Sequence, residues 1–315
     1  MGSHHLRTYS GLKGVELVGV VDANHERARD AADQYGCRAF NSHEQLVGEA
    51  EAVSVAVPSG LHAEVAGYLL ENGIHCLVEK PLATTEAECQ ALIDAAECRD
   101  LVLLVGHVER FNPVVDQLRA IAQRSTIHAI DVRRMSALSS RINDVDVVAD
   151  LMIHDIDVVL SLMRSPVADV FAQGVRTRGA TGQDYVSVNL AFEDGSMAQL
   201  AASRITQNKI RELHVTADLG LIAASYSTQE LLIYRQGTAS SIESSVGDAD
   251  YKLELAIERV LIRAQEPLVR ELTHFVEAVG SGEEPLVSGH DALQALRVGW
   301  SVQELMETGG GHAQA

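Results

Sequence analysis

The sequence contains few cysteines for its length. The four cysteines among 315 residues are Cys37, Cys76, Cys89 and Cys98, and no two of them form a Cys-x-x-Cys pair. A disulfide framework needs a much higher cysteine density, and a zinc site needs clustered ligands. We therefore expect four reduced thiols and no metal site.

Positive charge is also scarce. The chain has 25 Lys and Arg against 44 Asp and Glu, a formal net charge of -19 at pH 7. Nucleic acids and anionic membranes bind proteins through broad basic surfaces, so this balance argues against both as partners. It still allows a small anionic ligand held by a few arginines or backbone N–H groups.

Long hydrophobic runs are absent. No stretch of about 18 apolar residues occurs, so we expect no transmembrane helix. The first residues lack the apolar core of a secretory signal, which together with reduced cysteines predicts a cytoplasmic protein. The composition is 46% apolar and 22% charged, as in ordinary globular proteins, and the length suits two domains.

Residues 1–107 alternate between apolar runs and helical patterns. Four apolar runs predict buried strands: residues 15–22, 53–57, 75–79 and 101–105. Asn24 and Thr85 stand where they can cap intervening helices, and Gly36 stands at a helix end. Repeated β-α units with continuous apolar strands predict an α/β domain whose parallel sheet is covered on both faces.

The pattern changes near residue 107, so we divide the chain into domains 1–107 and 108–315. Helices are expected at residues 112–123, 147–163, 268–279 and 290–306. Strands are expected at residues 127–135, 170–174, 185–192, 197–203, 212–217, 220–225 and 231–234. This order predicts an α+β domain with an antiparallel sheet, and the small polar tail from Gly309 is expected to fray.

Asp22 ends the first predicted strand. In a dinucleotide-binding fold, an acid at this place binds the adenosine ribose hydroxyls about 20 residues after the glycine loop, and Gly2 lies 20 residues upstream. The alternative is a solvated acid at a helix N-terminus. A ribose-binding carboxylate would favour NAD over NADP.

The glycine fingerprint and the strand before it are missing from the start of the chain. One interpretation takes Met1-Gly2-Ser3-His4-His5 as the remnant of an expression tag. The interpretation we favour makes Gly2 the last glycine of the fingerprint, because residues 5–9 continue plausibly into the first helix. In that case the Rossmann-type domain lacks its first strand, and NAD binding is expected to be weak unless the strand is restored.

Two further places carry residues suited to catalysis. Lys80 follows the strand 75–79 and precedes Pro81, so we expect it to project from a strand end, where it can stabilise a developing alkoxide. Asp150 and His154 are four residues apart on a predicted helix and share one face, and histidine can take a proton near neutral pH. The alternative for Lys80 is a surface lysine. The alternatives for the acid–histidine pair are a helix N-terminus or a metal site, and the lack of a third ligand argues against the metal.

Four segments together resemble the Gfo/Idh/MocA family of nicotinamide-dependent sugar oxidoreductases. They are VVD ending at Asp22, VPSGLHAEVA at 57–66, EKPLA at 79–83 and DLMIHDID at 150–157. The resemblance implies an N-terminal Rossmann domain, here truncated, and a C-terminal α+β domain with an open, mostly antiparallel sheet. It also implies a homodimer or homotetramer formed through that sheet.

The resemblance also implies roles for individual residues. The Lys–Asp–His set of the family maps to Lys80, Asp150 and His154, with NAD as cofactor. The residues implied for the cofactor site are Gly2, Asp22, Pro58, Ser59, His62, Glu79 and Lys80.

Within the family, GHVERFNP at 106–113 is similar to the branch acting on the 3-hydroxyl of UDP-N-acetylglucosamine. Such a substrate needs cations for its diphosphate. The candidates for substrate contact are Arg110, Asn112, Arg141 and Lys209, with Arg134 and Arg211 as further cations. Other readings of the same residues are a simple sugar or inositol dehydrogenase, or a non-catalytic member of the fold that only binds a ligand.

Overall fold

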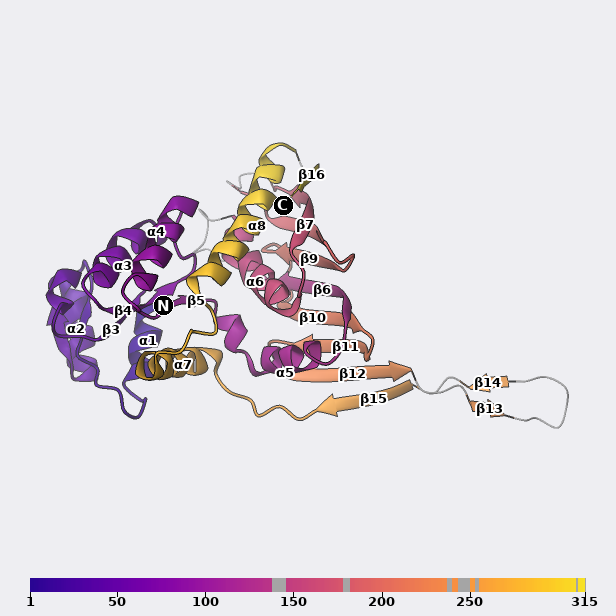
Figure 1. The fold of residues 1–315 in the computed structure, drawn as a ribbon, viewed down its shortest axis with the longest axis horizontal. Coiled ribbons are helices and arrows are strands. Elements are labelled where there is room, and N and C mark those ends of the chain that lie inside the picture. The colour runs from indigo at the N-terminus through magenta and orange to yellow at the C-terminus, as the bar shows by residue number, and fades with distance from the viewer. Residues whose placement is uncertain are drawn as a thin grey trace. The chain divides into compact units, whose positions relative to one another are not determined.

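The computed structural model describes residues 1–137, 146–177, 182–236, 240–242, 250–252, 255–309 and 311–314. The chain forms two compact units (Figure 1), one of Met1–Phe111 with Gln265–Arg297 and one of Asn112–Ala264 with Val298–Ala315. The expected division at residue 107 placed all later residues in one domain. The structure instead returns Gln265–Arg297 to the first unit, where the Val105 N–H donates to the Val287 carbonyl.

The first unit alternates strands and helices as predicted. Its elements are α1 (Gly2–Tyr9), β1 (Gly19–Val21), α2 (His25–Tyr35), β2 (Arg38–Phe40), η1 (His43–Leu46), β3 (Ala52–Val55), η2 (Ser59–Leu61), α3 (His62–Glu71), β4 (His75–Glu79), α4 (Glu86–Glu97), β5 (Leu103–Gly106), η3 (Val108–Phe111), α7 (Pro267–Ser281) and the first part of α8 (Gly289–Glu307). All strand pairs are parallel, and they form two pieces, β1-β2 and β3-β4-β5. Helix α7 returns to pack against α1 and η3.

Local sequence explains several of these boundaries. The Asn24 side chain accepts from the Glu26 and Arg27 N–H groups at the start of α2, and Gly36 ends that helix in a left-handed conformation. Thr85 and Glu88 form the predicted capping box of α4. The strand predicted at 15–22 shortens to Gly19–Val21, and α1 precedes it.

The second unit is built on one large sheet. Its elements are α5 (Pro113–Ala122), β6 (Ile127–Met135), η4 (Val148–Met152), α6 (Ile153–Leu162), β7 (Val167–Val175), β8 (Tyr185–Phe192), β9 (Met197–Ser203), β10 (Ile210–Ala217), β11 (Gly220–Ser225), β12 (Glu230–Gln236), β13 (Ser240–Ile242), β14 (Asp250–Lys252), β15 (Leu255–Val260), the end of α8 and β16 (Gly311–Gln314). The nine strands run in the order β15-β12-β11-β10-β6-β9-β8-β7-β16, and only β6-β9 is parallel.

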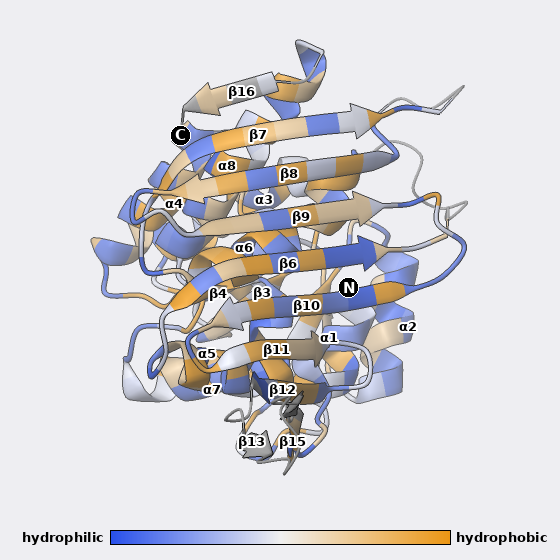
Figure 2. Cartoon of the chain, turned by 90° about the vertical axis from the view of Figure 1, so that its right-hand side faces the viewer, coloured by the Kyte–Doolittle hydropathy of each residue, from blue (hydrophilic) through white to orange (hydrophobic). Residues whose placement is uncertain are grey.

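Among the described residues, helices cover one face of this sheet and leave the other face open. Helix α6 contacts β6 and β9, and α5 contacts α6. On β8, buried Val186, Val188 and Leu190 alternate with residues that point to the other side, as a half-buried strand requires. Figure 2 shows the open face, where apolar and polar segments are mixed along the strands.

The helix expected at 147–163 is present, but it begins with a π-helical turn, Val148–Met152, before α6 starts at Ile153. One prediction about the second unit is wrong. The tail expected to fray forms β16, which pairs antiparallel with β7 because that strand has a free edge.

No helix in the described ranges is long and apolar enough to cross a membrane.

Candidate active site

Polar residues gather where the parallel strands of the first unit end. Glu79 ends β4 opposite Gly106, the last residue of β5. Lys80 follows Glu79 directly and is partly exposed, and the Lys80–Pro81 peptide bond is cis. The structure therefore places Lys80 at the carboxyl end of a parallel strand, the edge at which such sheets bind ligands.

Glu79, the residue before Lys80, forms a buried acid–histidine pair with His5. The Glu79 Oε1 atom is 2.9 Å from His5 Nε2, and both residues are buried. A Cβ atom on Gly106 would lie 3.1 Å from Glu79 Oε2, so glycine leaves room for this carboxylate. The pair links α1 to the end of β4. Sequence reasoning did not assign His5 a role, because its partner is 74 residues away.

His107 is a second residue that sequence reasoning left without a role. It follows β5 and is only 1% exposed. Burial lowers the pKa of His107 to about 3, and the positive charges of Arg110 and Lys80 act in the same direction. The imidazole is therefore neutral at neutral pH. Its position directly after an apolar strand was the signal that could have identified it.

Three of the residues implied for the cofactor site follow β3. Pro58 is exposed, Ser59 is half-buried, and they stand at the start of η2. His62 is buried, with ring nitrogens 2.7 Å from the Pro81 carbonyl oxygen and 2.9 Å from the Val57 carbonyl oxygen. The ring thus connects the segments that follow β3 and β4.

Asp22 lies at the end of β1, as predicted. Its Oδ1 accepts from the Asn24 N–H and from Arg27 Nη2, each at 2.8 Å. Burial alone would raise the pKa of Asp22, but the hydrogen bonds from Arg27 and Asn24 hold it below its ordinary value. The side chain is a partly exposed carboxylate at neutral pH.

These residues fit an NAD molecule. A carboxylate at the end of β1 can accept ribose hydroxyls. Gly2 is the first residue of α1, and a Cβ atom there would meet nothing within 4 Å, so the space at this helix N-terminus is open. Helix N-termini present N–H groups and a positive dipole end to phosphate.

The second unit carries the predicted acid–histidine pair. Asp150 lies in the π-helical turn and His154 lies in α6, and both are partly exposed between buried neighbours such as Met152 and Ile153. Short π-helical segments occur frequently at functional sites. The pair therefore spans the change from π to α geometry instead of lying on one regular helix.

Three of the expected substrate contacts have structural roles. Arg110 is buried, and its Nη2 donates to the Leu286 carbonyl at 2.9 Å. Arg134 is buried and forms a two-point ion pair with Asp155, both contacts at 2.8 Å. Asn112 is buried as the cap of α5. These three side chains are enclosed by the protein in this structure, and their contact with a substrate stays a prediction.

The remaining candidates for substrate contact are more exposed or lie outside the described residues. Lys209 is exposed between β9 and β10, and Arg211 is half-buried on β10. Arg141 lies outside the described residues. No group of histidine, cysteine, aspartate and glutamate able to hold a metal was found in the described part of the chain.

Two family models match the chain. Residues 1–107 match the Gfo/Idh/MocA oxidoreductase family with its NAD-binding Rossmann fold, and residues 126–223 match the Gfo/Idh/MocA C-terminal domain. The UDP-N-acetylglucosamine 3-dehydrogenase of Acidithiobacillus ferrooxidans is 31% identical over 98% of this chain and 94% of its own length. This chain belongs to the Gfo/Idh/MocA oxidoreductase family. The resemblance inferred from the four sequence segments is therefore confirmed.

Other relatives extend the comparison. A solved structure of the Acidithiobacillus ferrooxidans enzyme gives a TM-score of 0.87 at 30% identity and covers 96% of this chain and 93% of that one. The myo-inositol 2-dehydrogenase of Thermotoga maritima is 24% identical over 98% of this chain and 93% of its own length. These matches confirm the predicted fold class, a Rossmann unit followed by a unit with a mostly antiparallel sheet.

Proposed function

We propose that this protein is a dehydrogenase that oxidises one hydroxyl group of a sugar or sugar nucleotide with NAD. The observation that carries the proposal is Lys80 at the carboxyl end of β4 in an NAD-binding Rossmann unit. The finer proposal is the 3-hydroxyl of UDP-N-acetylglucosamine, supported by similarity to an enzyme of that name over 98% of the chain. A simple sugar or inositol is the second candidate, supported by the inositol dehydrogenase match.

The proposed catalytic residues act on the substrate hydroxyl. His154 takes its proton as a general base. Lys80 donates a hydrogen bond to the same oxygen and stabilises the negative charge that develops there. Asp150 positions the substrate. NAD supplies the hydride acceptor when bound.

The proposed binding residues hold the two ends of the cofactor and the substrate phosphates. Asp22 accepts from the adenosine ribose, and Gly2 at the start of α1 leaves room for the pyrophosphate. Pro58, Ser59, His62 and Glu79 belong to the nicotinamide end. Lys209 is the candidate for the substrate diphosphate, because its ammonium group is exposed.

We also propose that the open face of the large sheet joins copies of this chain in a dimer or tetramer. Met197 is 54% exposed, and its cross-strand neighbours are Ala129, Thr216 and then Leu221, which is 43% exposed. Exposed apolar side chains in one row favour a protein interface. Light scattering of the purified protein tests this proposal, and a monomer at all concentrations would contradict it.

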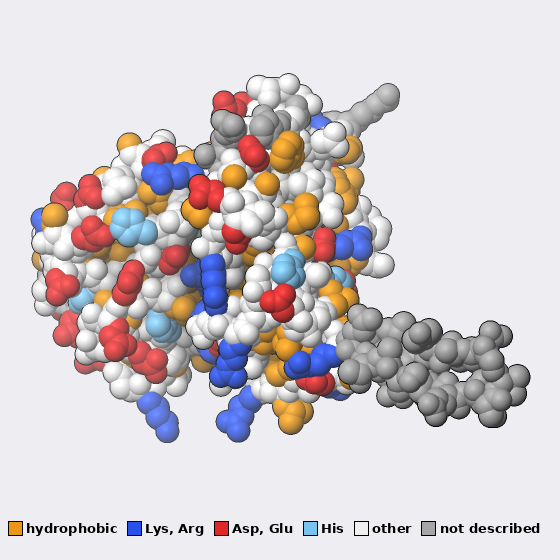
Figure 3. Space-filling view, turned by 45° about the vertical axis from the view of Figure 1, so that its right-hand side comes forward, with side chains coloured by type: hydrophobic (Ala, Val, Ile, Leu, Met, Phe, Trp, Pro, Cys, Tyr) orange, Lys and Arg blue, Asp and Glu red, His pale blue; other side chains and the backbone are white. Residues whose placement is uncertain are grey.

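Two further observations concern the location of the protein in the cell and the class of its substrate. All four cysteines are free, which supports the cytoplasm as location. On the face shown in Figure 3, acidic and basic side chains are interspersed among the described residues, which supports a small-molecule substrate over a nucleic acid.

The activity is tested by following NADH formation with UDP-N-acetylglucosamine, free N-acetylglucosamine and myo-inositol. We expect turnover with the nucleotide sugar, slowed when deuterium replaces hydrogen at its C3 atom. Turnover with myo-inositol alone would favour the second candidate. Binding of NAD without NADH formation from any of these compounds would contradict the enzyme proposal and favour a ligand-binding protein.

A further inference from the structure

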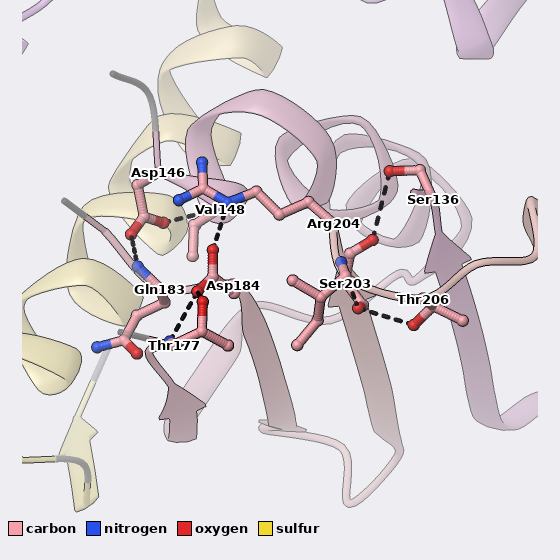
Figure 4. A network of polar contacts seen from close by, with 10 residues as sticks. Ser136, Asp146, Val148, Thr177, Gln183, Asp184, Ser203, Arg204 and Thr206 are labelled. Atoms are coloured by element: carbon pink, nitrogen blue, oxygen red, sulfur yellow. Dashed lines mark hydrogen bonds and ion pairs between the residues drawn. The ribbon is translucent and has the colours of Figure 1, made fainter. Parts of the chain in front are cut away.

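A polar network surrounds the start of the π-helical turn that carries Asp150 (Figure 4). The Asp146 carboxylate accepts two backbone N–H groups, that of Val148 at 2.7 Å and that of Gln183 at 3.0 Å. The Asp146 carbonyl accepts the Asp150 N–H at 3.0 Å. A single residue thus connects the helical turn to the segment that enters β8.

The fit around Asp146 requires a small neighbour. A Cβ atom on Gly182 would lie 2.9 Å from Asp146 Oδ2 and 3.2 Å from its Cα. A side chain there would displace the carboxylate from the Gln183 N–H. The contact therefore depends on glycine at position 182 as well as on the acid.

The segment that Asp146 holds is itself fixed. Asp184 follows Gln183, is 1% exposed, and accepts from the Thr177 N–H and from Arg204 Nε, each at 2.7 Å. Its own N–H donates to the Val175 carbonyl, and its carbonyl accepts the Arg204 N–H. The start of β8 is in this way tied to the ends of β7 and β9, and it gives Asp146 a rigid reference point.

The first turn of a helix generally needs a hydrogen-bond acceptor such as this carboxylate. The first N–H groups of any helix lack partners within the helix, and a carboxylate there also interacts favourably with the helix dipole. Short π-helical segments inside α-helices are rare and occur frequently at functional sites. A change of this turn to α geometry would move Asp150 relative to His154.

We infer that Asp146 is a positioning residue that fixes the turn bearing Asp150 relative to His154, an inference that rests on the proposed catalytic role of this pair. Misplacement of catalytic groups by about 1 Å can cost roughly 100-fold in rate. Removal of Asp146 should therefore lower kcat and leave NAD binding unchanged.

The experiment compares Asp146→Ala, Asp146→Asn, His154→Ala and the double variant Asp146→Ala/His154→Ala. The control is Asp194→Ala, since Asp194 also accepts a backbone N–H, that of Ser196, but lies at the opposite end of β8. NADH formation with UDP-N-acetylglucosamine gives kcat and KM. Hydrogen exchange by mass spectrometry follows the peptides that contain Val148 and Gln183.

We expect Asp146→Ala to lower kcat by about 10- to 100-fold and to speed exchange in both peptides, with a smaller effect for Asp146→Asn, which keeps one acceptor oxygen. Asp146→Ala should add little to His154→Ala, because both act through the same histidine. The control should match the unmodified protein in both measurements.

Any of three results overturns the inference. Asp146→Ala keeps kcat within about twofold of the unmodified protein, or hydrogen exchange in both peptides is unchanged. In the third, the double variant loses kcat by the product of the two single losses. Failure of the proposed function has a different signature, since the unmodified protein would then form no NADH, and failure of the catalytic role of His154 alone would leave His154→Ala with nearly full turnover. If only this inference fails, His154→Ala is impaired and Asp146→Ala is not.

Discussion

The two units place their candidate catalytic residues by different means. In the first unit, Lys80 stands directly after β4, so its place is set by a short stretch of sequence and the strand it ends. In the second unit, Asp150 stands in a π-helical turn. At the start of this turn, the Asp146 carboxylate accepts the N–H of Gln183, a residue distant in sequence. The comparison shows why a strand-end residue is easier to predict than one on an irregular helix.

The units also differ in the polar groups that they bury. The second unit buries two aspartate–arginine pairs, Asp155 with Arg134 and Asp184 with Arg204. In the first unit, His107 is buried, and its lowered pKa of about 3 leaves it neutral at neutral pH. A buried ion pair is costly to break from either side, whereas a buried neutral histidine makes stability depend on pH. This difference leads to three predictions, given in order of expected effect.

The largest effect is expected from breaking the pair of Asp155 and Arg134. Asp155→Ala leaves a buried guanidinium without its carboxylate, which typically costs about 3–5 kcal/mol in free energy of unfolding. Urea denaturation measures this loss. The matched control is Glu86→Ala, which removes the partner of Arg297 in a pair whose side chains are about half exposed, and should cost at most about 1 kcal/mol. Equal losses for the two variants would contradict the assignment of Arg134 to the core.

The second prediction concerns the stability of the protein at acidic pH. Because the folded pKa of His107 is about 3 against an ordinary 6.5, the unfolded chain takes up a proton below pH 6.5 that the folded chain does not. The free energy of unfolding therefore falls as pH falls from 6.5 toward 3, by about 1.4 kcal/mol per pH unit. Urea denaturation between pH 7 and pH 5 should show this slope, and His107→Asn should reduce it.

Asp184 gives the contrasting case in the second unit. Burial raises its pKa, but hydrogen bonds from Thr177 and Arg204 outweigh burial and hold the pKa below its ordinary 3.8. Its contribution to stability is therefore fully present above pH 3.8 and is lost only as pH falls through the lower folded value. Asp184→Asn should leave the slope between pH 7 and pH 5 unchanged. An unchanged slope in His107→Asn would show that His107 is not the group responsible.

Much of the fold could be predicted because its signals are local. Asn24 and Thr85 cap the helices they were expected to cap, and β8, β9 and β11 begin and end at the predicted residues. Lys80 and Asp22 follow from the same logic, since each ends an apolar run. These features depend on a few neighbouring residues.

The remaining features depend on contacts between distant parts of the chain. Arg110 looked like a cation for a phosphate, but the Leu286 carbonyl accepts from it across 176 positions. Near the π-helical turn, Asp146 accepts the N–H of the distant Gln183, and β16 pairs with β7, which lies far away in the sequence. A pattern of apolar residues along one segment carries no information about such partners.

The third prediction has the smallest expected effect and concerns Asp22 in the first unit. Asp22→Ala removes a charged acceptor for ribose hydroxyls and should weaken NAD binding by about tenfold, since hydrogen bonds to charged groups contribute about 1.5–3 kcal/mol. NADP binding should weaken less, because the carboxylate repels its 2′-phosphate. Fluorescence titration measures both, with the exposed Asp30→Ala on α2 as control. Tighter binding of NADP than of NAD by the unmodified protein would contradict the assignment.

The central proposal is that Lys80 and His154 are catalytic residues of this dehydrogenase. The most direct measurement is the rate of NADH formation in a single turnover with UDP-N-acetylglucosamine, compared between the unmodified protein, Lys80→Ala and His154→Ala. We predict that His154→Ala lowers this rate by about 10²–10⁴ and that Lys80→Ala also lowers it strongly, while both variants still bind NAD. The combined variant should lose far less than the product of the single losses, because the residues act as a unit. Nearly full rates in both single variants would contradict the proposal and leave these residues with structural roles.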